Sequence, residues 1–275
     1  MHFLISWPKK PTGFEIHTKG RDFPMTNPKK KNLLIAGCCA AVFLLILLLV
    51  SAVDVAAIGP EGTSVGLSHL NGAFHDLTGF REGLYSLTEK LGYLTLLLAA
   101  AFACLGVYQL AQRRSLRRVD RELWVLAGLY AAVLVLYVLF ERVVINYRPV
   151  LMPDGQGPEA SFPSSHTMLA VTIWGSAFLL LDCYGMQKPL RIGGQIACCV
   201  LGAAIVLGRL LCGVHWLTDI LAGLSLGAAL LFVFRALLPA APDKASAPQT
   251  PAEAPAPSPA DAEAYRGRHE KKQRS

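Results

Sequence analysis

The chain has 275 residues, 53% of them hydrophobic and 16% charged, whereas typical soluble domains carry about 25% charged residues. Nine of the charged side chains lie in residues 1–32 and eleven in residues 239–275, which leaves the centre with too few to form a wettable surface. This composition excludes a soluble enzyme, a disordered protein and a small disulfide-stapled secreted module, and it indicates a polytopic membrane protein.

Six apolar segments are long enough to cross a bilayer, which requires a helix of about 20 apolar residues. The first, Leu33–Val53, is longer than the apolar core of a signal peptide, which has about 7–15 residues. We therefore predict an all-α fold, a six-transmembrane-helix bundle. The remaining expected spans are Leu91–Leu110, Trp124–Ile145, His166–Tyr184, Ile192–Leu211 and Leu217–Leu238.

Between the first two spans, residues 60–90 carry apolar side chains at spacings of three and four. This helical spacing predicts an amphipathic segment at the outer interface. Met25 would also serve as a start, so residues 1–24 are expected to be dispensable. The expected organisation is a cytoplasmic basic N-terminal segment at 1–32, a six-span domain at 33–238 and a disordered Ala/Pro-rich cytoplasmic tail at 239–275.

Basic residues cluster on one side of the six expected spans. They lie before the first span, between the second and third, between the fourth and fifth, and in the C-terminal tail. Because cytoplasmic loops are enriched in Lys and Arg, both termini are predicted to be cytoplasmic, and loops 58–90 and 146–165 extracytoplasmic. This placement explains the net charge of +7 without a nucleic-acid partner. The seven cysteines show neither metal spacing nor a disulfide framework, and the oligomeric state stays open.

Ionisable residues in or beside membrane spans are costly, so each is a candidate for function. Here they gather at the expected outer ends of spans three to six, and together they suit an anionic, tetrahedral ligand. They form three runs: Glu141, Arg142 and Arg148 within 141–149; Ser164, Ser165 and His166 within 161–167; and Arg209, His215 and Asp219 within 208–219.

Four of these residues suit phosphate binding. Arg148 and Arg209 carry planar guanidinium groups that hold phosphate oxygens in bidentate fashion. Ser164 and Ser165 are expected to open the fourth helix, where free backbone N–H groups form a natural anion site. Two arginines beside the histidines would repel a cation, so we expect no metal site.

Three others suit acid–base and nucleophilic chemistry. His215 and Asp219 are four residues apart at the start of a helix and share one face. Asp219 can therefore fix the tautomer of His215 and leave its other ring nitrogen free to attack. His166, on another helix, is placed to protonate a leaving oxygen.

The three runs resemble the signature motifs of the type 2 phosphatidic acid phosphatase superfamily, K-x6-R-P, P-S-G-H and S-R-x5-H-x3-D, in that order over roughly residues 33–238. The resemblance is to the membrane-bound lipid phosphatase branch and implies a metal-independent reaction without a cofactor. It implies that His215 forms a phosphohistidine, that Asp219 orients it, that His166 is the general acid, and that Arg148, Arg209 and Ser164 bind phosphate.

Three positions depart from these motifs. Glu141 stands where the family has a lysine, and its carboxylate would repel phosphate unless it is paired or protonated. Arg142 is only a partial substitute, because the next residue on a helix points about 100° away. Ser165 replaces the glycine of the second motif and Gly208 the serine of the third, which are milder exchanges.

We therefore expect an integral protein of the cytoplasmic membrane with its active site on the extracytoplasmic face. Its predicted partners are membrane lipids, and its predicted reaction removes phosphate from a lipid phosphomonoester or pyrophosphate. Phosphatidate, phosphatidylglycerol phosphate and undecaprenyl diphosphate remain equivalent candidates. Two alternatives stay open: a lipid phosphotransferase that uses the same site, and a non-catalytic lipid-binding protein of the same fold.

Overall fold

The computed structural model describes residues 27–152, 157–184 and 186–239. The predictions for residues 1–24 and for the tail beyond residue 239 lie outside these residues. Six helices are long and apolar enough to cross a membrane, in agreement with the predicted all-α fold. They are α1 (Pro28–Ala52), α3 (Glu82–Arg113), α4 (Arg121–Arg142), the span formed by α5 (Ser165–Leu169), η3 (Ala170–Trp174) and α6 (Gly175–Cys183), α7 (Lys188–Leu211) and α8 (Leu217–Leu237).

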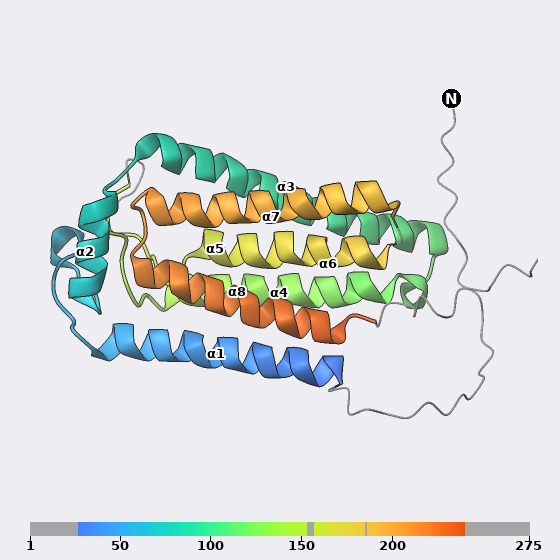
Figure 1. Cartoon of the computed structure of the whole chain (residues 1–275), viewed down its shortest axis with the longest axis horizontal. Coiled ribbons are helices and arrows are strands. Elements are labelled where there is room, and N and C mark those ends of the chain that lie inside the picture. The colour runs from blue at the N-terminus through green and yellow to red at the C-terminus, as the bar shows by residue number, and fades with distance from the viewer. Residues whose placement is uncertain (1–26, 153–156, 185, 240–275) are drawn as a thin grey trace, which may run out of the picture. The chain divides into compact units, whose positions relative to one another are not determined.

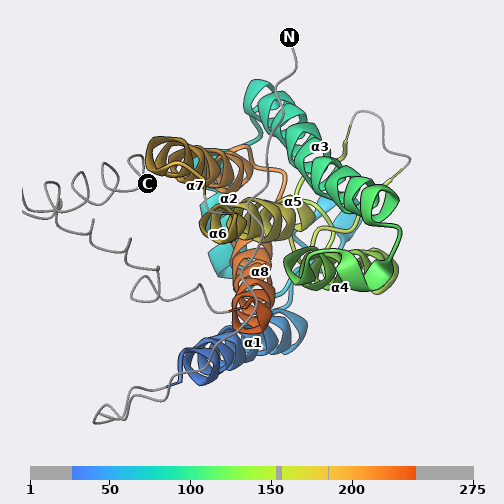
Figure 2. The same cartoon turned by 90° about the vertical axis from the view of Figure 1, so that its right-hand side faces the viewer.

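The six spans run side by side, and the short helix α2 (Ser68–Thr78) lies across one end of them (Figure 1). Seen along the bundle, α8 lies between α1 and the α5–α6 span, whereas α3 and α7 pack together on the far side (Figure 2). The starts of α3, α5 and α8 all lie at the end covered by α2. The polar runs of the sequence are therefore gathered at one end of the bundle.

Apolar side chains serve both the interior and the outer surface of this bundle. The main core joins α1, α4, α5 and α8, and it contains Phe43, Leu126, Met168 and Phe234. Many leucines and valines on the outward faces are exposed, as Leu97 is at 66%. Such a surface is stable only in a hydrocarbon environment, because each exposed aliphatic side chain is costly in water.

The outer segment between the first two spans differs from the single amphipathic stretch predicted at 60–90. It consists of a short 3₁₀ turn, η1 (Pro60–Gly62), the helix α2, and then the start of α3 at Glu82. The second span thus begins well before the expected Leu91. Hydropathy does not detect the first part of α3, because its residues are polar. Since α3 begins at Glu82, Glu89 lies inside this helix, near the end of the bundle that carries the polar runs.

Two polar contacts anchor α2 to the spans. The Asp54 carboxylate accepts hydrogen bonds from Ser68 Oγ and from the backbone N–H of His69, both at 2.9 Å. The His69 bonds are the main reason that the pKa of Asp54 lies below its ordinary value. The buried Asn71 side chain donates to Thr218 Oγ1 at 2.9 Å and accepts from the Thr218 backbone N–H at 3.2 Å. The start of α8 is thereby held against α2.

Candidate active site

The loop after α4 is folded into a short paired structure that carries Arg148 to the site. Tyr147 forms an antiparallel bridge with Ala160, and the Arg148 backbone N–H donates to the Glu159 carbonyl at 2.9 Å. Trp216 Nε1 donates to the Tyr147 carbonyl at 2.7 Å and so connects this loop to the start of α8. This side-chain-to-backbone hydrogen bond therefore holds the first and third polar runs together.

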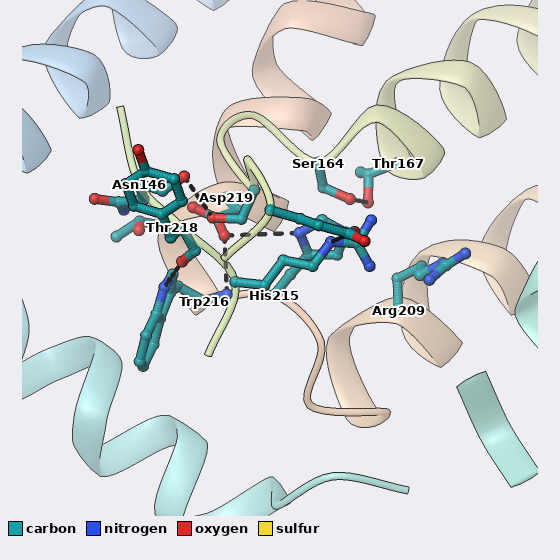
Figure 3. Close-up of polar contacts among 12 residues, drawn as sticks. Asn146, Ser164, Thr167, Arg209, His215, Trp216, Thr218 and Asp219 are labelled. Carbon is teal, nitrogen blue, oxygen red and sulfur yellow. Dashed lines mark hydrogen bonds and ion pairs between the residues drawn. The ribbon is translucent and has the colours of Figure 1, made fainter. Parts of the chain in front are cut away.

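The second run forms the start of α5, as predicted. Ser164 is the N-cap residue and is fully buried, and its backbone N–H donates to the Asp219 carbonyl at 3.0 Å. Its hydroxyl accepts from Thr167 Oγ1 at 3.1 Å (Figure 3). The close approach of the two helices depends on Gly223, where a Cβ atom would lie 2.7 Å from the Ser164 carbonyl oxygen. The backbone N–H groups of a first helical turn have no partner within the helix, so those of α5 are available to an anion.

His215 and Asp219 lie together in the buried end of the bundle (Figure 3). Asp219 Oδ2 accepts from the Trp216 backbone N–H at 3.0 Å and lies 3.7 Å from His215 Nδ1. Burial lowers the pKa of His215 well below its ordinary value, and the charges of Arg148 and Arg209 lower it further. The imidazole is therefore neutral near pH 7, and its Nε2, which has no hydrogen-bond partner, is available as a nucleophile.

The two arginines supply buried donors that the protein leaves unpaired. The Arg209 side chain is fully buried and stacks over the Tyr85 ring, with 5.3 Å between the guanidinium carbon and the ring centroid. Its Nη2 contacts the Glu89 carboxylate, whereas its Nε and Nη1 have no partner. Arg148 Nε lies 3.2 Å from Glu159 Oε2, and its buried Nη1 has no partner. Because an unpaired buried donor costs about 1–3 kcal/mol, this arrangement favours an anion with several oxygens.

His166, on α5, is held in position by residues of α3. Its Nε2 lies 3.4 Å from Glu89 Oε1, and its buried Nδ1 has no hydrogen-bond partner. A Cβ atom at Gly92 would lie 3.0 Å from the imidazole ring, so the glycine makes room for it. Glu89 was not predicted, because the second span was expected to begin only at Leu91; a carboxylate directly before a long apolar run was the signal that could have identified it.

Of the two charged residues near the usual lysine position, Glu141 and Arg142, only one lies at the site. Glu141 is among the residues that line a small cavity together with Arg148, Ser165 and His215, so the residue at the usual lysine position borders the site. Arg142 is exposed at the end of α4 and does not line this cavity. The structure thus brings Glu141, but not Arg142, to the predicted phosphate-binding residues.

Gly208, at the usual serine position, has a structural explanation. A Cβ atom at this position would lie 2.4 Å from Thr88 Cγ2 on α3. The space that a serine side chain would need is therefore filled by a side chain from the second span.

We expect Gly208→Ser to lower the thermal unfolding midpoint, because overpacking of a tight contact costs about 1–3 kcal/mol. The double variant Gly208→Ser/Thr88→Ala should recover most of this loss, since it removes the methyl group that the new Cβ atom meets. Unfolding of the purified protein in detergent measures both. Equal midpoints for the single and double variants would contradict the proposed clash.

Among residues 27–152, 157–184 and 186–239, no three His, Cys, Asp or Glu side chains gather as metal ligands. Metal independence of the reaction stays a prediction.

Comparison with known proteins gives one family match and one similar fold. Residues 145–242 match the family model of the PAP2 superfamily, a stretch that includes Arg148, His166, Arg209, His215 and Asp219. The fold is similar to the crystal structure of the first transmembrane PAP2 type phosphatidylglycerolphosphate phosphatase from Bacillus subtilis. The TM-score is 0.51 at 20% sequence identity, over 72% of this chain and 94% of that chain. A search of curated proteins finds no match.

The six spans define an integral membrane protein, and buried arginines and histidines with unpaired polar atoms gather at one end of its helical bundle. The match over residues 145–242 is to the superfamily that the three sequence motifs predicted. The comparisons support a PAP2-type membrane phosphatase, a hydrolase, and leave its specific substrate open. The roles of the individual site residues stay predictions.

Proposed function

We propose that this protein hydrolyses a phosphate ester or anhydride of a membrane lipid through a phosphohistidine at His215. The observation that carries the proposal is the set of buried, unpaired groups at one end of the bundle: His215 Nε2 and guanidinium N–H groups of Arg148 and Arg209. They match the nucleophile and the oxygen ligands that phosphoryl transfer requires.

The proposed reaction has two steps. His215 Nε2 attacks phosphorus, the bond from phosphorus to the leaving oxygen breaks, and His166 gives its proton to that oxygen. Water then attacks the phosphohistidine, the phosphorus–nitrogen bond breaks, and His166 takes the proton of the water. Arg148, Arg209 and the N-terminal N–H groups of α5 stabilise the charge on the phosphoryl oxygens in both steps.

A groove beside the site supports a lipid substrate. It has a volume of about 470 Å³ and lies between α3, α4 and the α5–η3 segment, with Glu89 and His166 among the lining residues. Most of the other side chains that line it are apolar or aromatic. A phosphate held by the arginines could therefore keep its hydrocarbon chain in this groove and remain in the membrane.

Orientation in the membrane follows from the basic residues. Five arginines, at positions 113, 114, 117, 118 and 121, lie at the junction of α3 and α4, which is the end of α3 away from Glu82 and the site. The positive-inside rule then places the site on the extracytoplasmic face and both termini in the cytoplasm. A green fluorescent protein fused to the C-terminus should fold in the cytoplasm and fluoresce. The same protein fused after residue 66 should be exported and should not fluoresce. The reverse pattern would overturn this orientation.

The proposed function is tested by phosphate release from a panel of lipid phosphates and pyrophosphates, with purified protein, EDTA throughout and the His215→Ala variant as blank. We expect release by the wild type alone. A phosphorylated acceptor lipid without free phosphate would indicate the phosphotransferase, and tight headgroup binding without turnover would indicate the non-catalytic alternative; either result would overturn the hydrolase proposal.

A further inference from the structure

One face of α3 forms a wall of the site that none of the three motifs supplies. Tyr85, Thr88, Glu89 and Gly92 follow the spacing of one helical face, and each meets a residue of the site. Tyr85 lies under the Arg209 guanidinium, Thr88 fills the space at Gly208, and Gly92 lies against the His166 ring. Glu89 is the charged member of this face.

Glu89 joins two residues from different helices. Its Oε1 contacts Arg209 Nη2 on α7 and lies 3.4 Å from His166 Nε2 on α5. In the part of the chain that the structure describes, His166 has no other ion pair with a carboxylate. A carboxylate at this depth of a membrane span is costly, and the ion pair with Arg209 and the contact with His166 stabilise it there.

We propose that Glu89 is a positioning residue for the general acid: it holds His166 in place for proton transfer, as Asp219 holds His215 for attack. The proposal rests on the proposed function. Two histidine–carboxylate pairs, one on each side of the phosphate, would then share the chemistry, and one of the two carboxylates comes from the second span.

The geometry explains how such a pair would act. With Nε2 on the carboxylate and the ring against Gly92, His166 is fixed in orientation, and Nδ1 remains free for the leaving oxygen. Before transfer, the carboxylate balances the imidazolium charge beside two arginines. After transfer, it keeps the remaining proton on Nε2, so that Nδ1 can accept the proton of the attacking water.

Substrate binding does not require Glu89 to leave Arg209. The guanidinium contacts the carboxylate through Nη2, whereas its Nε and Nη1 are the unpaired donors. A phosphate can therefore bind to these two nitrogens while the contact with Glu89 persists. The Glu89 carboxylate thus orients both Arg209, which binds the phosphate, and His166, the general acid.

The test compares two phosphate esters with different leaving groups. Hexyl phosphate releases an alkoxide that must be protonated, whereas p-nitrophenyl phosphate releases a phenolate that leaves without a proton. We expect Glu89→Gln to lower kcat for hexyl phosphate by roughly 10²-fold, the scale of general acid catalysis, and for p-nitrophenyl phosphate by less than about threefold. His166→Ala should show the same split, and the double variant should add little to it.

Glu82→Gln is the matched control, because Glu82 is exposed in the first turn of the same helix; both rates should stay within about twofold of wild type. If Glu89→Gln does not fold, as judged by thermal unfolding, the comparison is made with Glu89→Asp, for which the same split is expected at smaller size.

Equal losses for the two esters would show a merely structural role and overturn the proposal. Faster turnover of both esters would overturn it as well, since Glu89 would then compete with phosphate for Arg209. Failure of the proposed function itself would be recognised separately, because His215→Ala would then release phosphate from both esters at the wild-type rate.

Discussion

Replacing His215 by glutamine should reduce phosphate release from every substrate by at least about 10³-fold, because the enzyme would lose its nucleophile. Glutamine fills a similar volume and keeps hydrogen-bonding groups near Asp219, so the buried end of the bundle should stay folded. The wild-type imidazole is available for attack because burial and the two arginines keep its pKa low and the ring neutral.

The intermediate itself supplies a second measurement. Brief incubation of the wild type with a radiolabelled lipid phosphate, followed by denaturation in alkali, should leave label on the protein, since a phosphohistidine is labile in acid and stable in base. His215→Gln should carry no label. His69→Gln is the control, because the His69 side chain is 92% exposed on α2, outside the site. Label on the His215→Gln protein would assign the nucleophile to another residue.

The second large effect is expected for Arg209→Lys, which keeps the positive charge. The guanidinium of Arg209 contacts Glu89 through one nitrogen and leaves two others for the phosphate, which a single ammonium group cannot reproduce. Loss of two charge-assisted hydrogen bonds, each worth about 1.5–3 kcal/mol, should lower kcat/KM by roughly 10²- to 10⁴-fold.

The matched control for this exchange is Arg121→Lys. Arg121 is exposed at the start of α4, at the opposite end of the bundle from the site. The kcat/KM of the Arg121→Lys variant should stay within about twofold of the wild-type value. Near-normal kcat/KM for Arg209→Lys would mean that charge alone suffices, and it would contradict bidentate binding by the guanidinium.

Much of this protein could be predicted because the signals are local. Hydropathy determines the six spans, since a helix in hydrocarbon must be apolar over its whole length. The helix start at Ser165 and the pairing of His215 with Asp219 follow from residue type and from spacing along one helix. The candidate site residues of the three motifs therefore follow from short-range spacing alone.

What the sequence determined by itself was the membrane class, the number of spans and the residues of the three motifs, because each depends on composition or on short-range spacing. Only the tertiary structure decided that Glu89 meets His166 and Arg209, that Thr88 occupies the space at Gly208, and that Glu141 borders the site cavity while Arg142 does not. These contacts depend on where a polar helix start falls and on how each helix is rotated toward its neighbours. Both follow from the packing of residues that are distant in the sequence.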